Sequence, residues 1–194
     1  MQQKSNMTNQ KKIENAELKS YLNLLNDEQK MKFWIKTLLS TYNNIPEIIK
    51  AVDKIIEIQA SSLTFISDIY YTEKSTYSQV EKVIDLSERK NNLLNIYLIT
   101  KNLFSSISEE ERTFMERRFV FNWTAEELAT EYEVSTRTIF RKIEKIIDKI
   151  YAATKRKNWS LKLITMQIKN EQWLTDKFNK IVKDYYQSTK SLLS

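Results

Sequence analysis

The side chains whose types and spacing suggest chemistry lie at residues 124–151, which read TAEELATEYEVSTRTIFRKIEKIIDKIY. Arginine can form two hydrogen bonds with a guanine edge, threonine can contact a base or a thymine methyl group, and lysine can neutralise a phosphate. A helix that carries these residues outward could place its N-terminal turns in the major groove of DNA. The outward positions are Thr136, Arg137, Phe140, Arg141, Lys142 and Lys145.

Two helices joined by a tight turn must position these side chains. Thr124 is followed three residues later by Glu127, which predicts a capping box at the start of the first helix. Leu128 and Ala129 then face inward, and Ser135 predicts the N-cap of the second helix. This is the pattern of a helix-turn-helix. The buried stripe of the second helix comprises Ile139, Ile143, Ile146 or Ile147, and Ile150.

Charge is segregated along this part of the chain. Residues 135–158 contain eight Lys and Arg against two Asp and Glu, a net charge of +6, whereas residues 107–134 contain three against eight, a net charge of −5. The basic half is the half predicted to meet DNA. The competing interpretation is an ordinary amphipathic helical hairpin whose basic face is simply solvated.

The composition of the 194 residues excludes most enzyme templates. The chain has no Cys, no His and no Gly. It therefore lacks disulfides, thiolate and imidazole metal sites, Ser-His-Asp and Cys-His catalysis, and the glycine loops that hold phosphates. Its Asp and Glu residues are scattered over helical positions that should face solvent. We expect no enzyme, no metal and no cofactor.

The same composition predicts the fold class. With no Gly and a single Pro, Pro46, the chain lacks the turn residues of β-hairpins, so we predict an all-α fold. No apolar run approaches the roughly 20 residues of a membrane span, and the polar N-terminus has no signal-peptide core. We expect a soluble, cytoplasmic protein.

Hydrophobic periodicity divides the chain into five segments. They are a disordered stretch at 1–10, N-terminal helices at 11–45, a helical hairpin at 46–106, the helix-turn-helix at 107–152 and C-terminal helices at 153–194. Within the hairpin, residues 77–107 read as one helix on the order of 45 Å long, too long to be covered by one small globule. We expect it to pack against the preceding helix or against its copy in a homodimer, the dimer being inferred from length alone.

Two apolar stripes run along that long helix. The first comprises Tyr77, Val80, Ile84, Leu94 and Leu98, and the second Val83, Leu86, Leu93, Tyr97 and Phe104. Ser87 and Asn91 fall within the first stripe, where polar residues can set the register of paired helices. Packing inside a helical bundle is the simplest interpretation of both stripes.

Three motifs occur in succession from Ile107 onward: the pair Arg118-Phe119, then TAEELA at 124–129, then VSTRTI at 134–139. In this order and spacing they resemble region 4 of bacterial sigma-70-type factors. With the long helix included, residues 46–152 are similar to phage and prophage late-gene regulators of the ArpU/RinA kind.

The resemblance implies a transcriptional regulator that binds double-stranded DNA with its second helix in the major groove. Carried over by position, it implies DNA contacts from Ser135, Thr136, Arg137, Thr138, Arg141 and Lys142. Lys145, further along the helix, is assigned to a phosphate.

Two positions depart from the family pattern. The glycine usual before the TAEELA helix is Asn122 here, which tolerates a left-handed conformation. The glycine usual in the turn between the helices is Glu133, where a left-handed residue would cost about 1 kcal/mol. Either the turn differs from that of the family or packing compensates.

Other functions compete with the regulator. A sigma-like factor would bind RNA polymerase and would need a promoter-melting helix, for which the one candidate is Lys32-Phe33-Trp34, and its apolar flanks suggest burial. A DNA-marking structural or packaging subunit, similar to a small terminase, is the third possibility. We prefer the sequence-specific regulator.

Overall fold

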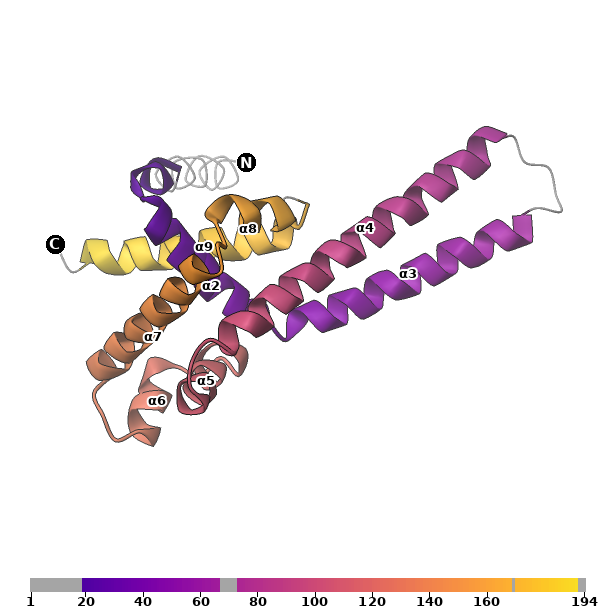
Figure 1. The fold of residues 1–194 in the computed structure, drawn as a ribbon. Coiled ribbons are helices and arrows are strands. Elements are labelled where there is room, and N and C mark those ends of the chain that lie inside the picture. The colour runs from indigo at the N-terminus through magenta and orange to yellow at the C-terminus, as the bar shows by residue number, and fades with distance from the viewer. Residues whose placement is uncertain (1–18, 67–72, 169, 192–194) are drawn as a thin grey trace, which may run out of the picture.

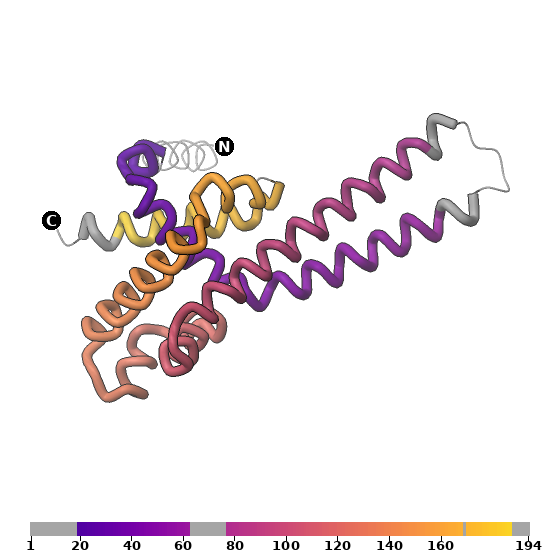
Figure 2. The backbone as a smooth tube through the Cα atoms, viewed as in Figure 1, coloured from indigo at the N-terminus to yellow at the C-terminus, as the bar shows by residue number. Residues whose placement is uncertain are grey.

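The structure, a computed structural model, describes residues 19–66, 73–168 and 170–191 (Figures 1 and 2). Within these ranges every regular element is a helix, which confirms the predicted all-α class. A long arm of two helices, α3 (Asn44–Ile66) and α4 (Glu73–Phe104), projects from a body made of the other helices (Figure 1). The stretch 1–10, predicted to be disordered, lies outside the described residues.

α2 (Asp27–Thr41) is the central helix of the body. It begins at a capping box in which the Asn26 side chain accepts from the backbone N–H of Gln29 at 2.8 Å, and the Gln29 side chain accepts from that of Asn26 at 3.0 Å. The helix packs against α4, against the C-terminal helices α7 (Thr136–Arg156), α8 (Leu161–Ile168) and α9 (Gln172–Ser191), and against the π-helical segment η1 (Glu116–Val120). Apolar side chains are therefore buried on more than one side of α2, and Ile35 and Leu39 are completely enclosed.

The arm consists of α3 (Asn44–Ile66) and α4 (Glu73–Phe104), which lie antiparallel and side by side (Figure 2). Pro46 lies near the start of α3, where its missing N–H has no partner in the helix to lose. Between the helices, the ammonium of Lys90 pairs with the Asp53 carboxylate at 2.5 Å. α4 leads directly from the tip of the arm back into the body, so it fixes the direction of the arm.

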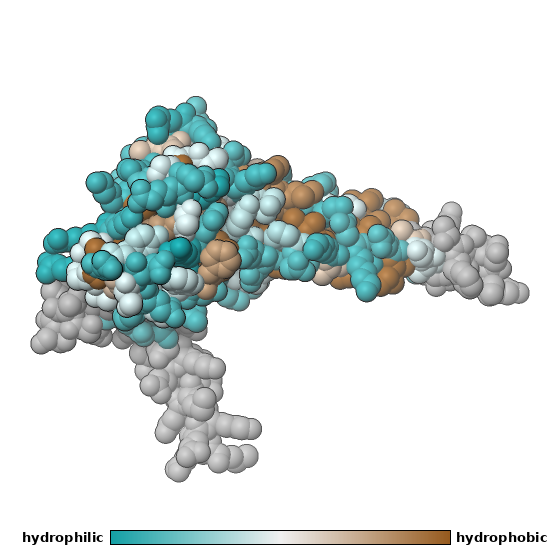
Figure 3. Space-filling view, turned by 90° about the horizontal axis from the view of Figure 1, so that it is seen from below, coloured by the Kyte–Doolittle hydropathy of each residue, from teal (hydrophilic) through white to brown (hydrophobic). Residues whose placement is uncertain are grey.

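The two apolar stripes of α4 have different surroundings. In the second stripe Leu93 and Phe104 are buried and the other members are partly buried. The first stripe is open: its exposed fractions are Tyr77 75%, Val80 42%, Ile84 53%, Leu94 37% and Leu98 52%. Figure 3 shows hydrophobic side chains gathered along the arm. The expectation that both stripes pack inside a bundle is wrong for the first, because α3 covers only one side of α4.

Three short segments connect the arm to α7: α5 (Glu109–Met115), a π-helical turn η1 (Glu116–Val120) and α6 (Ala125–Glu131). The capping box predicted at the start of α6 is present, and α5 also begins with one, between Ser108 and Glu111. Phe114 and Met115 are fully buried, whereas Phe121 is 64% exposed. The π turn accommodates an extra residue, and it thereby rotates Phe121 away from the core face.

α7 (Thr136–Arg156), α8 (Leu161–Ile168) and α9 (Gln172–Ser191) complete the body. The predicted isoleucine stripe of α7 is buried, including both Ile146 and Ile147. α9 lies against α2, where the rings of Trp34 and Phe178 stack with their centres 4.2 Å apart. The N-terminal and C-terminal helices thus share one hydrophobic core with residues 107–152.

A buried carboxylate ties the body to the base of the arm. Glu171, in the turn between α8 and α9, is 1% exposed. Its two oxygens accept hydrogen bonds from Nε and Nη2 of Arg89 on α4, at 2.8 and 3.1 Å, and from Nε1 of Trp173 at 2.7 Å. Because all these bonds converge on one buried group, they hold the arm in a defined position on the body.

Candidate nucleic-acid interface

The residues predicted to contact DNA begin at the N-terminus of α7. The Ser135 hydroxyl caps this helix by accepting from the backbone N–H of Thr138 at 3.2 Å, and the two hydroxyl oxygens lie 2.9 Å apart. The first turn of α7, which the structure describes in full, contains no acidic residue, whereas the first turns of α5 and α6 contain three and two. The partial positive charge at this helix end is therefore available to an anion.

The turn before α7 is built on a left-handed residue. α6 ends with a hydrogen bond from the N–H of Val134 to the carbonyl of Ala129 at 3.0 Å and another from Glu133 to Thr130 at 3.3 Å, the pair of bonds of a Schellman motif. Glu133 has φ of 53°, a conformation that favours glycine. The turn therefore keeps the left-handed residue of the family pattern although it is not a glycine. Packing accompanies it, because the neighbouring Tyr132 ring lies edge-on against the buried ring of Phe114.

Replacement of Glu133 by glycine should stabilise the protein by about 1 kcal/mol, because glycine removes the contact between Cβ and the carbonyl oxygen in a left-handed residue. Urea unfolding followed by circular dichroism measures the change. Asn158→Gly is the matched control, since Asn158 has φ of 55° after α7 and asparagine tolerates that conformation better. No gain in Glu133→Gly would show that Glu133 is not strained, and an equal gain in both variants would show that glutamate is no more strained there than asparagine.

A row of three cations lies along the outer face of α7. Arg137, Arg141 and Lys145, which we call the cationic row, are exposed and succeed one another at intervals of four residues, about 6 Å along the helix axis. None of the three forms an ion pair within the part of the chain that the structure describes. The row lines an open groove of about 860 Å³. The groove residues are Thr136, Arg137, Phe140, Arg141, Glu144, Lys145 and Asp148.

The two carboxylates in this groove are neutralised by ion pairs with lysines of α2. Glu144 pairs with the ammonium of Lys36 at 2.6 Å, and Asp148 pairs with that of Lys32 at 2.8 Å. The hydrogen bond with Asp148 is the largest cause that raises the pKa of Lys32, so this lysine keeps its charge. The acids of α7 are thereby offset, and the cationic row gives the groove a positive potential.

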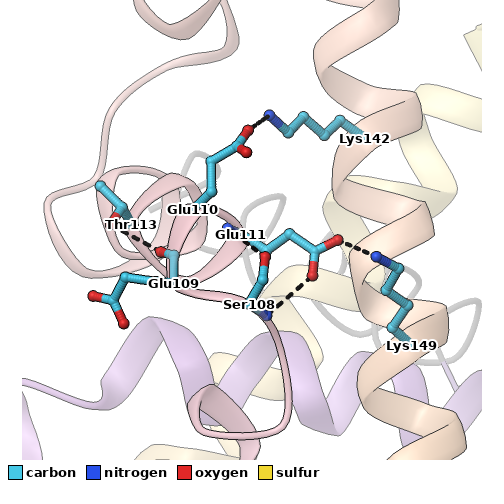
Figure 4. Close-up of polar contacts among 7 residues, drawn as sticks. All are labelled: Ser108, Glu109, Glu110, Glu111, Thr113, Lys142 and Lys149. Carbon is cyan, nitrogen blue, oxygen red and sulfur yellow. Dashed lines mark hydrogen bonds and ion pairs between the residues drawn. The ribbon is translucent and has the colours of Figure 1, made fainter.

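Lys142, also predicted to contact DNA, lies on a different face of α7. Its ammonium pairs with Glu110 of α5 at 3.3 Å and lies 4.7 Å from the ring centre of Phe114. Two turns further along, Lys149 pairs with Glu111, so that both lysines reach across to α5 (Figure 4). These two ion pairs, which we call the clamp, join α7 to α5.

Glu111 is the more enclosed of the two carboxylates in this clamp. Its hydrogen bond with Lys149 is the main cause that lowers the pKa of Glu111, and the backbone N–H of Ser108 adds to the effect at 3.3 Å. A carboxyl with a lowered pKa contributes stability above its unfolded pKa, and this contribution is lost as the pH falls through the lower folded value. Because exposed ion pairs contribute no more than about 1 kcal/mol each, the clamp adds little to the stability of the fold.

Phe140 belongs to the groove, although the sequence-based assignment of DNA contacts left it out. It is 53% exposed and lies between the two arginines of the cationic row. An apolar contact with a thymine methyl group is one of the ways in which proteins read the major groove. The signal in the sequence was a large aromatic residue at an outward position of an otherwise polar helix face.

The structure thus separates the sequence-predicted residues into three groups. Thr136, Arg137, Arg141 and Lys145 line the groove, Ser135 and Thr138 close the helix N-terminus, and Lys142 joins the clamp to α5. Elsewhere in the described residues no three potential metal ligands cluster, and no helix combines the length and apolar character that crossing a membrane requires. Comparison with protein-family models, curated proteins and solved structures gives no significant match.

Proposed function

We propose that the chain is a sequence-specific, double-stranded DNA-binding transcriptional regulator in which α6 and α7 form a helix-turn-helix. The observation that carries this proposal is the cationic row, exposed and without carboxylate partners among the described residues, while α2 neutralises the acids beside it. In this function Arg137 and Arg141 read base edges, Phe140 contacts a thymine methyl group, and Lys145 meets a phosphate.

The packing beneath α7 supports the proposal, because base readout requires side chains held to within a fraction of an ångström. Leu128 and Ala125 of α6 are buried where α6 meets α7, and Ala129 is partly buried beside them. Small residues at such a crossing allow two helices to approach closely. Together with the clamp from α5, this contact leaves α7 little freedom to tilt.

The interior position of α2 favours a regulator over a complete sigma-like factor. Promoter melting would need exposed aromatic side chains that stack on bases. Phe33 and Trp34 are only 6% and 7% exposed, and Trp34 is stacked on the ring of Phe178. These aromatic residues serve the core, so a contact with RNA polymerase would have to serve regulation and not melting.

Selection of bound sequences from a random duplex library, combined with affinity measurements against salt, tests the proposal. We expect an enriched motif whose binding constant falls with salt with a slope of about −0.9 for each phosphate contacted. Equal binding to all sequences would restrict the chain to non-specific DNA association. Absence of binding would show that the groove serves another partner.

A further inference from the structure

The exposed stripe of α4 has the spacing of a heptad repeat. Its members alternate in spacings of three and four residues without interruption, and we call them the α4 seam. They are Tyr77, Val80, Ile84, Ser87, Asn91, Leu94 and Leu98. This is the spacing that keeps one stripe of a helix against a partner helix over its whole length. Because α3 packs on the second stripe, the seam is not needed to hold the arm together.

Exposed apolar surface is concentrated on the arm. Of the fourteen large hydrophobic side chains that are exposed in the described residues, five belong to the α4 seam and two more, Ile55 and Ile58, lie on α3. The body, by contrast, shows a mostly hydrophilic surface in the same view (Figure 3). Apolar side chains gathered in this way mark an interaction surface.

We propose that the α4 seam pairs with the same seam of a second copy of the chain, in parallel and in register. The polar residues of the seam identify this partner. In a parallel, in-register pair Ser87 meets Ser87 and Asn91 meets Asn91, whereas a shift by one heptad places Asn91 against an apolar side chain. A single asparagine in such a seam fixes register and favours two strands.

The charges that flank the seam decide the direction of pairing. An antiparallel pair that still matches polar with polar sets Ser87 against Asn91, and it brings Glu88 beside Glu88 on one flank, whereas Lys90 on the other flank is already paired with Asp53 of α3. Like charges in these positions are destabilising. In the parallel pair Glu88 faces an uncharged side chain of the other copy. Charge therefore favours the parallel arrangement.

The parallel arrangement has a consequence that rests on the proposed function. Because α4 enters the body at its C-terminal end, paired arms hold both bodies at the same end. Two α7 helices are then presented together to one duplex, as required for a site with two half-sites.

Sedimentation of the full chain tests the pairing. We expect a mass twice the 23.2 kDa of one chain, dissociating on dilution. The double substitution Ile84→Glu with Leu94→Glu should give a monomer with unchanged circular dichroism, because both side chains are exposed in the single chain. Met166→Glu, an exposed apolar residue of α8 outside the arm, is the matched control and should remain dimeric. A monomeric wild type, a ring-sized oligomer or a dimeric double variant would each overturn the pairing.

Disulfide formation tests the direction, since the chain has no cysteine of its own. Under oxidation Ser87→Cys should form a covalent dimer, whereas Asp85→Cys, exposed and outside the seam, should not. An antiparallel pair would instead link Ser87→Cys chains only to Asn91→Cys chains in a mixture of the two, which would overturn the parallel arrangement. Equal cross-linking through Asp85→Cys would overturn it as well.

Neither measurement contains DNA, so the two proposals fail separately. A monomeric chain that still binds its selected DNA site overturns the dimer and leaves the proposed function standing. A parallel dimer that binds no DNA overturns the proposed function and leaves the dimer standing.

Discussion

Replacing Arg137 and Arg141 with alanine should weaken binding to the selected DNA site by about 1 to 3 kcal/mol for each arginine, and it should relax the sequence preference at the bases that they contact. The free energy of unfolding should change by less than about 0.5 kcal/mol, because both side chains are exposed and form no ion pair within the described residues. Fluorescence anisotropy at one fixed salt concentration measures the first quantity, and urea unfolding the second.

The same helix supplies the controls for this prediction. Arg156 is exposed near the C-terminus of α7, about 28 Å along the axis from Arg137, so Arg156→Ala should bind as the wild type does. Lys145→Ala should weaken binding to all sequences alike and reduce the salt slope by about one phosphate contact. Wild-type affinity in the double arginine variant would contradict the assignment of α7 as the reading helix.

Lys142 could either orient α7 through its ion pair with Glu110 or contact DNA directly, and these two roles predict different results. In the structure it is held by Glu110, so Glu110→Gln should affect DNA binding in the same direction as Lys142→Ala if the clamp orients α7. If Lys142 bound a phosphate directly, removing the acid Glu110 would strengthen binding, because it would free the lysine. The signs of the two effects therefore decide its role.

Features fixed by neighbours three or four residues away could be predicted from the sequence. The capping box at Thr124 and the buried isoleucines of α7 are of this kind. In each, a helix start or a helix face is determined by the local spacing of side chains. The cations on the outer face of α7 were found through the same periodicity. The left-handed residue at Glu133 was expected only from the resemblance to the family pattern.

Features that depend on distant partners could not be predicted. Glu144 appears in the sequence as an acid within a basic face, and only the fold brings Lys36 to it from α2, 108 residues earlier. The Lys142 side chain points toward Glu110, and this direction depends on where α5 lies. The exposure of Phe121 follows a π-helical turn that could not be predicted from the sequence pattern. Likewise, periodicity found both stripes of α4 but could not say which one α3 would cover.

The part played by the C-terminal helices is also a matter of long-range packing, and it gives the largest stability effect that we expect. Phe178→Ala should cost about 3 to 5 kcal/mol of unfolding free energy. Phe178 of α9 is buried and stacked on Trp34 of α2, and α2 in turn packs against α7. Removing the ring opens a cavity in the core on which α7 rests.

Urea unfolding monitored by circular dichroism and tryptophan fluorescence measures this loss, with Leu163→Ala on the more exposed side of α8 as the control. If α9 belongs to the same folding unit as α7, both probes should shift together to lower urea, and DNA binding should disappear at temperatures at which the wild type still binds. A separate early transition with DNA binding unchanged would mean that the C-terminal helices fold independently of the DNA-binding body. Because a domain is stable by only about 5 to 15 kcal/mol, a loss of about 3 to 5 kcal/mol in a shared core should lower the temperature at which α7 unfolds, although the two residues that stack lie outside the groove.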